Sequence, residues 1–406
     1  MMNLDPGNRL VRPTKVADAA VHAAWILVVD DSASQRELIQ AHLHAAGFAN
    51  LAFAESGARA LESISKLTPD LVILDVNMPG MSGLEVCRKL RQSPETSDMP
   101  ILISTTVTAT RQWNDIFAAG ASDIVTKPVN RSELAARVCV QLERRLLERR
   151  MDEYLEQLQM ELSAARKMQL ALVPSDAERQ SISAEAGVSI GTFTGTYFDI
   201  GGDCWGLRRI DEGRIGVYMA DFSGHGISAA INVFRLHLLL DQLKSVWANP
   251  LALTATLNAR LVTLLPRGQF AAWIYGVLDR TAGVFRYCNA GLPPPIFCAG
   301  EGAEPTQSGN YGLPLGIDAA AQYTLAVAPL QAGGFLFLRS DGVDDLVDAS
   351  GERIGADAVF TLVARRANTA SAQSLIDQVC GDILSHGETG VRDDISALCI
   401  RRNLDS

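Results

Sequence analysis

The sequence lacks the long apolar run that a membrane-spanning helix needs, since no uninterrupted apolar stretch approaches about 18 residues. The opening residues MMNLDPGNRLVRPTK also lack the apolar core of a signal peptide. Positive charge is in deficit, because 36 Lys and Arg face 46 Asp and Glu and give a net charge of −10. A surface that binds nucleic acid usually carries a basic patch. We therefore expect a soluble, cytoplasmic protein that contacts neither nucleic acid nor a membrane directly.

Cysteine is scarce and scattered. The 7 cysteines form no CxxC pair and no evenly spaced framework, so we expect reduced core thiols rather than disulfides or a zinc site. The C-terminal half contains no Ser-His-Asp or Cys-His constellation and no phosphate loop of the GxxxxGK[ST] type. These absences exclude the common nucleophilic hydrolases and P-loop enzymes for that half.

Length and residue pattern predict two globular domains with a helical connection. We expect a flexible tail over residues 1–23, which carry two prolines and no clear period. Across residues 24–142, short apolar runs alternate with helical stretches, which is typical of a doubly wound α/β domain with a parallel sheet. Over residues 185–402, short β-rich segments and helical patterns are joined by Gly and Pro turns. This pattern predicts an α/β layered domain with an antiparallel β-sandwich flanked by helices.

The helical linker is predicted over residues 132–174, where glycine is absent and proline does not appear before Pro174. Apolar residues recur there at three-four spacing, although Gln169 interrupts the pattern. They are Met151, Leu155, Leu158, Leu162, Ala165 and Leu172. Two interpretations stay open: a dimeric coiled coil that carries a signal, or a solvated helix packed on one domain.

Acidic residues follow two strands of the predicted parallel sheet. Asp30 and Asp31 come directly after Ile26–Val29, and Asp75 follows Leu71–Leu74. Because ligands bind beyond the carboxyl ends of parallel strands, we expect these carboxylates to converge. Such a cluster would repel itself without a cation, and oxygen ligands select Mg²⁺ or Mn²⁺.

A hydroxyl and an ammonium are expected at the same edge. Thr105 follows Ile101–Ser104, and Lys127 stands before Pro128 after the next strand. Both side chains could bind a phosphoryl group carried by Asp75.

This stretch resembles the receiver domains of two-component response regulators over about residues 25–142. The matching segments are VVDDS (28–32), LDVNMPGMSGLE (74–85), the hydroxyl residues 104–106, and TKP (126–128). The resemblance implies that Asp75 accepts phosphate from a histidine kinase or phosphotransfer protein. It also implies that Asp30 and Asp31 bind Mg²⁺ together with Asp75. Thr105 and Lys127 would sense the phosphoryl group.

One receiver position departs from the pattern. Ile124 stands where many receivers carry an aromatic residue that swings inward with the threonine. We therefore expect the signal to leave by movement of the last helix into the linker. The resemblance also implies a cis peptide between Lys127 and Pro128.

Four aspartates in the C-terminal half lie beside predicted strands, mostly next to glycine. They are Asp203 in DIGGD (199–203), Asp221 in ADFSGHG (220–226), Asp341 in RSDGV (339–343) and Asp393 in RDDIS (392–396). Such carboxylates could meet at one sheet edge, and without compensating bases they need cations. Two Mg²⁺ or Mn²⁺ ions would suit oxygen ligands and would serve the hydrolysis of a phosphate monoester.

Together these motifs resemble the PPM-type metal-dependent serine/threonine phosphatases, particularly the bacterial branch linked to sporulation and stress partner switching. Supporting segments are NAGLPPP (289–295) and GLPLGI (312–317). The resemblance covers about residues 185–402 and implies hydrolysis of phosphoserine or phosphothreonine on a partner protein. The expected substrate is an anti-sigma-factor antagonist.

The same resemblance implies two sets of metal ligands. One metal is assigned to Asp203, Asp221 and the Phe222 carbonyl. The other is assigned to Asp221, Asp341 and Asp393.

Two further residues are candidates for accessory roles, and two positions depart from the phosphatase pattern. Asp394 could orient Asp393 or water, and His225 could act as an acid or simply shape its loop. Gly206 stands where the branch often shows another aspartate, and Leu292 replaces a frequent histidine.

The combined hypothesis is a response regulator with phosphatase output. Phosphorylation of Asp75 would change receiver packing or dimerisation, and the linker would pass the change to the phosphatase. We expect a homodimer formed through the linker or the receiver. The alternative is a catalytically silent partner-binding module controlled by the receiver.

Overall fold

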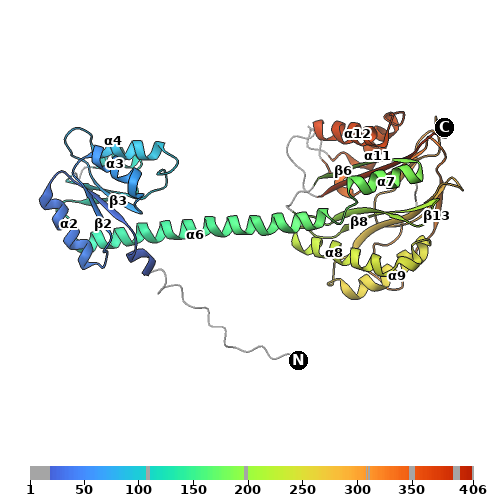
Figure 1. Cartoon of the computed structure of the whole chain (residues 1–406), viewed down its shortest axis with the longest axis horizontal. Coiled ribbons are helices and arrows are strands. Elements are labelled where there is room, and N and C mark those ends of the chain that lie inside the picture. The colour runs from blue at the N-terminus through green and yellow to red at the C-terminus, as the bar shows by residue number, and fades with distance from the viewer. Residues whose placement is uncertain are drawn as a thin grey trace, which may run out of the picture. The chain divides into compact units, whose positions relative to one another are not determined.

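The computed structural model describes residues 19–106, 110–195, 200–307, 309, 311–346, 353–386 and 394–404. The chain divides into two compact units, with the boundary between Leu158 and Gln159. Figure 1 shows the helices and strands of both units. Within the described residues, no helix combines the length and apolar character that crossing a bilayer requires.

The first unit contains a five-stranded parallel sheet in the order β2-β1-β3-β4-β5. Its strands are β1 (Ile26–Val29), β2 (Leu51–Ala54), β3 (Leu71–Asp75), β4 (Ile101–Thr105) and β5 (Asp123–Thr126). The helices of this unit are α2 (Ala33–Ala45), α3 (Gly57–Leu67), α4 (Gly83–Gln92), α5 (Thr110–Ala118) and the first part of α6 (Arg131–Leu170).

Helices cover both faces of this sheet. Alternate strand residues such as Ile26 and Val28 pack with α2 and with Leu134 and Val138 of α6. The intervening residues of the same strands pack with α3, α4 and α5. The apolar strands are buried on both sides for this reason, and the predicted doubly wound α/β class is confirmed.

The second unit contains two five-stranded sheets whose strands pair antiparallel, in the orders β13-β10-β9-β8-β7 and β12-β11-β14-β15-β6. The first sheet consists of β7 (Asp203–Arg209), β8 (Arg214–Phe222), β9 (Ala271–Asp279), β10 (Val284–Ala290) and β13 (Ala326–Pro329). The second consists of β6 (Val188–Gly195), β11 (Ile296–Cys298), β12 (Thr306–Gln307), β14 (Phe335–Arg339) and β15 (Ile395–Arg402).

Three apolar clusters make this unit a four-layer α-β-β-α sandwich. One lies between the sheets, one joins the first sheet to α8 and α9, and one joins the second sheet to α11 and α12. The helices of the unit are α7 (Asp176–Ala186), α8 (Ile227–Gln242), α9 (Pro250–Leu264), α10 (Asp341–Asp344), α11 (Gly355–Arg365) and α12 (Ala372–His386), with a 3₁₀ turn at Lys244–Val246. The predicted β-sandwich flanked by helices is confirmed.

The linker is one continuous helix, α6, of 40 residues. Of the predicted apolar stripe, Met151 and Leu155 are exposed, whereas Leu162 and Ala165 are half-buried. Gln169, which interrupts the stripe, is also half-buried. The stripe is therefore exposed at Met151 and Leu155 and partly covered at Leu158, Leu162 and Ala165.

Three elements differ from the sequence-based prediction. Residues 19–22, assigned to the flexible tail, form a helical turn in which Val21 is buried. Strand β2 was not anticipated, because it is short and only Ala54 in it is buried. Helix α7 was also not anticipated, although Ser175 and Glu178 form a capping box at its start.

Candidate functional sites

Three aspartates meet beyond the carboxyl ends of β1 and β3. Asp30 and Asp31 follow β1, and Asp75 is the last residue of β3. One carboxylate oxygen from each lies within 4.8 Å of the others. Asp30 and Asp75 are buried, whereas Asp31 is exposed. The arrangement supplies only oxygen ligands, which suits a hard divalent cation.

Lys127 is paired with two of these carboxylates. Its Nζ atom lies 2.7 Å from Asp75 Oδ1 and 2.9 Å from Asp30 Oδ2. Burial raises the pKa of the Asp75 carboxyl, the Lys127 pair opposes this, and the charges of Asp30 and Asp31 add to the rise. Burial lowers the pKa of the Lys127 ammonium, but its bonds to the two carboxylates outweigh burial and raise that pKa. The lysine thus offsets part, not all, of the negative charge.

The remaining receiver candidates lie at the neighbouring strand ends. Thr105 ends β4 and is fully buried, and its carbonyl accepts a hydrogen bond of 2.8 Å from the Lys127 amide. The Lys127–Pro128 peptide is cis, as predicted. Ile124 is buried in the core that packs against α3, α4 and α5. The structure therefore brings the hydroxyl, ammonium and carboxylate residues to one edge of the sheet.

In the second unit, two aspartates face each other across adjacent strands. Asp203 begins β7, and Asp221 lies near the end of β8, directly opposite it in the antiparallel register. Opposed residues place their side chains on the same face. Asp203 is 9% exposed, and neither of its carboxylate oxygens has a hydrogen-bond partner.

Two more aspartates lie at the matching ends of the second sheet. Asp341 follows β14, and Asp394 directly precedes β15. Ser340 ties these ends together, because its amide donates to the Ser396 carbonyl and its Oγ accepts from the Ser396 amide, each at 2.9 Å. We call Asp203, Asp221, Asp341 and Asp394 the aspartate edge.

Two glycines allow the two sheets to approach each other here. The Gly202 amide donates a 2.7 Å hydrogen bond to Asp394 Oδ2. A Cβ atom on Gly201 would lie 2.1 Å from the same Oδ2, and one on Gly202 would lie 2.7 Å from the Phe222 carbonyl oxygen. Only glycine fits at these positions, because the carboxylate and the carbonyl occupy the space that a side chain would fill.

Burial raises the pKa of Asp203 well above its usual range, and the nearby charges of Asp394 and Asp341 add to the rise. The nearby hydroxyls of Ser340 and Ser396 oppose this rise only in part. A buried carboxylate without donors is costly. The oxygen-rich edge therefore fits divalent cations, which would balance this charge.

The aspartate edge is looser than the receiver cluster. Among the residues that the structure describes, no three of its carboxylates approach one another within 4.8 Å. Asp393, assigned by resemblance to the second metal, lies outside the described residues. Asp341 and His225 are both exposed.

A buried arginine near Asp341 was not singled out from the sequence. Arg339 ends β14 with a side chain that is 0% exposed, and its Nε and Nη2 atoms lie 2.6 and 3.1 Å from the Asp344 carboxylate. Its Nη1 also donates to the Pro294 carbonyl at 3.2 Å. Arg339 therefore fixes the turn that carries Asp341. The sequence feature that could have revealed this buried arginine is a charged residue at the end of the apolar run FLFLR.

Gln169 is the second residue that sequence reasoning left without a role. Its Nε2 donates to the Gly201 carbonyl at 2.7 Å, and its Oε1 accepts from the Gly201 amide at 3.3 Å. The end of α6 is thereby bonded to the glycine pair of the aspartate edge. The sequence feature that could have revealed this role is the polar interruption that Gln169 makes in the apolar stripe.

The two departures from the phosphatase pattern have structural explanations. A Cβ atom on Gly206 would lie 2.3 Å from the Tyr218 hydroxyl oxygen, so no larger residue fits there. Leu292 is buried between the sheets, and its amide donates to the Asn289 side chain. Neither position belongs to the aspartate edge.

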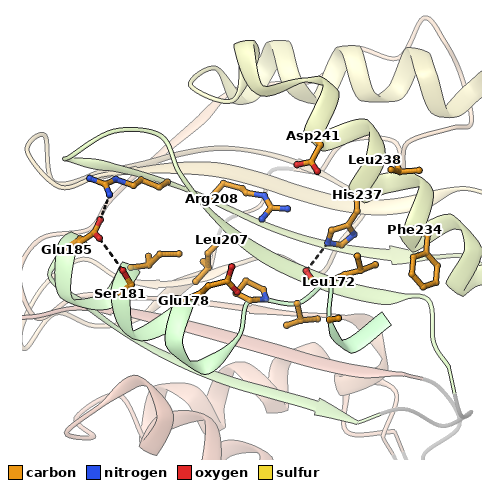
Figure 2. A pocket seen from close by; sticks show the side chains of 15 residues that line it. Leu172, Glu178, Ser181, Glu185, Leu207, Arg208, Phe234, His237, Leu238 and Asp241 are labelled. Atoms are coloured by element: carbon orange, nitrogen blue, oxygen red, sulfur yellow. Dashed lines mark hydrogen bonds and ion pairs between the residues drawn. The ribbon is translucent and has the colours of Figure 1, made fainter. Parts of the chain in front are cut away.

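A groove of about 580 Å³ lies between α7, β7 and α8 (Figure 2). It is lined at the far end of β7 by Leu207, Arg208 and Arg209, about 13–20 Å along the strand from Asp203. Inside it, the His237 ring is hydrogen-bonded to the Leu172 carbonyl at 3.1 Å. The groove is therefore separate from the aspartate edge and adjoins the segment that follows α6.

Comparisons with known proteins agree with this geometry. Residues 26–139 match the model of the response regulator receiver domain, and residues 211–403 match the model of stage II sporulation protein E, SpoIIE. The DNA-binding response regulator MtrA of Mycobacterium tuberculosis is 42% identical over 119 residues, which cover 29% of this chain and 50% of MtrA. The response regulator PleD of Caulobacter vibrioides is 39% identical over 116 residues, covering 29% of this chain and 25% of PleD.

The chain thus spans about half or less of these curated relatives. Among solved structures, the SiaA-PP2C domain of Pseudomonas aeruginosa aligns with a TM-score of 0.55 and 19% identity, over 61% of this chain and 98% of that domain. This likeness shows the fold.

Fold and sites together define a chain of two domains, in which a receiver domain is followed by a domain with the sandwich fold of the SiaA-PP2C domain. The chain joins a response regulator receiver domain, residues 26–139, to a PP2C-type phosphatase domain of the SpoIIE family, residues 211–403.

Proposed function

We propose that this chain is a response regulator whose output is a metal-dependent protein phosphatase acting on phosphoserine or phosphothreonine. The observation that carries the proposal is the aspartate edge. Asp203 offers two buried oxygens without hydrogen-bond partners, and Asp341 and Asp394 add negative charge beside it. Such a site is balanced by cations rather than by the protein's own bases.

Two Mn²⁺ or Mg²⁺ ions would be held by residues from both sheets. We assign one to Asp203, Asp221 and the Phe222 carbonyl, and the other to Asp221, Asp341 and Asp393. When bound, such ions supply Lewis-acid stabilisation of the charge that develops on the phosphoryl oxygens. The overall reaction consumes one water and releases the free hydroxyl and inorganic phosphate.

The protein's own groups position this edge. Asp394 accepts the Gly202 amide and so keeps the glycine pair against β15; we assign it an orienting role. Arg339 holds the turn of Asp341 through Asp344. His225 is exposed in the loop before α8, and we assign it an accessory role there.

In the receiver, we assign Asp75 as the phosphoacceptor for a histidine kinase or phosphotransfer protein. Asp30 and Asp31 would hold Mg²⁺ with it. Lys127 already contacts the Asp75 carboxylate, so its ammonium is placed to pair with a phosphoryl group on that side chain. Thr105, at the end of the next strand, would sense the phosphoryl group on Asp75.

Helix α6 would carry the signal. It begins in the receiver unit, and Gln169 near its other end is bonded to Gly201. The carbonyl of Leu172, just beyond the helix, is bonded to His237 of α8. A shift of α6 would therefore disturb the backbone that holds Asp394. The exposed Met151 and Leu155 support pairing of two linkers as a homodimeric coiled coil.

The substrate we propose is a phosphorylated protein of the anti-sigma-factor-antagonist type, as the SpoIIE family match supports. The pathway output would be altered transcription without contact between this chain and DNA.

The testing experiment measures hydrolysis of p-nitrophenyl phosphate and of a serine-phosphorylated protein, with Mn²⁺, Mg²⁺ or a chelator, and with or without acetyl phosphate. We expect metal-dependent turnover that changes with acetyl phosphate. Asp203→Asn should abolish turnover, whereas Asp211→Asn, a matched change at an exposed residue paired with Arg214, should not. If the wild type hydrolyses neither substrate with either metal, the silent partner-binding module becomes the better account.

A further inference from the structure

Helix α8 carries exposed apolar residues close to the aspartate edge. Ile227 and Ile231 are 56% and 46% exposed, although the opposite side of the helix is buried in the core. They lie one turn apart on the helix and therefore share a face. Helix α8 starts directly after the short loop that follows β8, and Asp221 is the next-to-last residue of β8.

Hydrogen bonds join this face to the end of α9 and to the segment just before β9. Arg235 Nη1 donates to the Asn232 side chain at 3.0 Å and to the Leu264 carbonyl at 3.4 Å. Asn232 Nδ2 donates to Gln269 Oε1 at 2.9 Å. Leu264 and Phe270 are 45% and 37% exposed. We call this surface the α8–α9 face; it consists of Ile227, Ile231, Arg235, Leu264, Arg267 and Phe270.

The α8–α9 face is continuous with the aspartate edge. Ser223 comes two residues after Asp221, and its amide donates to the Phe270 carbonyl at 2.9 Å. In return, the Phe270 amide donates to Ser223 Oγ at 2.8 Å. A protein whose phosphorylated residue reaches Asp221 must therefore cover neighbouring surface, and this face adjoins that position.

Charge gives the face a preferred partner. Two of the six residues that form the face, Arg235 and Arg267, are cationic and none is acidic, although the whole chain carries −10. Exposed apolar side chains interspersed with arginine are the composition that protein interfaces favour. An acidic partner is attracted to it electrostatically.

From this continuity and charge we infer that the α8–α9 face is the docking surface for the phosphoprotein substrate, and that it takes a protein with acidic and apolar side chains around the phosphorylated residue. The inference rests on the proposed phosphatase function and adds the surface and chemistry of substrate selection. A small aryl phosphate is too small to cover this face, so its hydrolysis does not depend on it.

The experiment compares kcat and KM for two substrates, serine-phosphorylated casein, which is acidic, and p-nitrophenyl phosphate, both with Mn²⁺. The variants are Ile231→Asp, Leu264→Asp and Arg267→Glu. The matched control is Leu238→Asp, at a residue 66% exposed on the same helix but lining the distant groove. Phosphorylated myelin basic protein serves as a basic substrate for comparison.

We expect each face variant to lower kcat/KM for casein by about tenfold, mainly through KM, a loss of the size that removing an interface anchor causes. Hydrolysis of p-nitrophenyl phosphate should stay within about twofold. Leu238→Asp should leave kcat/KM for both substrates unchanged. The ratio of kcat/KM for casein to that for myelin basic protein should be smaller in Arg267→Glu than in the wild type.

Unchanged casein kinetics in all three variants would overturn the inference, as would equal losses on both substrates. A change from dimer to monomer in Ile231→Asp, with both activities lost, would show that a second copy covers the face and would also overturn it. If the wild type hydrolyses neither substrate, the proposed function fails, an outcome distinct from loss of selectivity alone.

Discussion

Gly201→Ala tests the aspartate edge with the smallest available change. The added Cβ would lie 2.1 Å from Asp394 Oδ2 and 2.5 Å from its Cγ. Normal contact needs at least about 3 Å, so the carboxylate must retreat by about 1 Å in a close-packed interior. That movement would break its 2.7 Å bond from the Gly202 amide.

The size of the effect follows from these contacts. A hydrogen bond to a charged group contributes about 1.5–3 kcal/mol to the free energy of unfolding. At about 2–4 °C per kcal/mol for a domain of this size, the melting temperature should fall by about 3–12 °C. Because a misplacement of about 1 Å can cost about 100-fold in rate even when the moved residue only orients the site, kcat for p-nitrophenyl phosphate should fall by about that factor.

The control for this prediction is Gly381→Ala in α12, where nothing lies within 4 Å of the added Cβ. It should leave kcat unchanged and raise stability slightly, by up to about 1 kcal/mol, since alanine is the better helix former. Full activity of Gly201→Ala at saturating Mn²⁺, in a folded protein, would refute the reasoning that Asp394 must stay against the glycine pair.

The other predictions concern charge, the linker and the receiver. In metal-free protein the pKa of Asp203 is raised, so this carboxyl costs stability once the pH exceeds its pKa in the unfolded chain, about 4. Asp203→Asn should therefore raise the melting temperature more at pH 8 than at pH 5. A larger gain at pH 5 would contradict this. Gln169→Leu removes two hydrogen bonds to Gly201, together about 1–3 kcal/mol, and should raise the Mn²⁺ concentration for half-maximal activity by about five- to 150-fold. An unchanged Mn²⁺ titration curve argues against coupling through this contact. Asp75→Asn should abolish labelling of the protein by radioactive acetyl phosphate. The control Asp123→Asn, which breaks an ion pair with Arg137, should still be labelled. Labelling of the Asp75→Asn protein would place the phosphoacceptor elsewhere.

Local patterns were sufficient to predict the fold class and to place most candidate residues at strand ends. Asp30 and Asp75 directly follow or end apolar runs, and parallel strands bring such positions together by geometry alone. Asp203 and Asp221 stand in short Gly/Asp motifs whose positions beside strands were predictable. Their exact opposition across β7 and β8 was not, because antiparallel register depends on long-range pairing.

Contacts between distant segments set the limit of prediction. Gln169 looked like a flaw in an apolar stripe, and its bond to Gly201 depends on the packing of α6 against a loop 32 residues away. Gly206 looked like a lost ligand, but its size is dictated by Tyr218 on the neighbouring strand. Strand β2 has too few buried residues to give an alternating pattern.

Strand β15 has a consequence for the synthesis of the protein. It lies between β6 and β14 and supplies every described pairing of β6, although the two strands are separated by about 200 residues of chain. The second sheet therefore cannot close on the ribosome before Ile395–Arg402 have been translated. Asp394, at the start of that strand, arrives equally late. A nascent chain therefore contains all five strands of the receiver sheet well before the second sheet of the other unit can close.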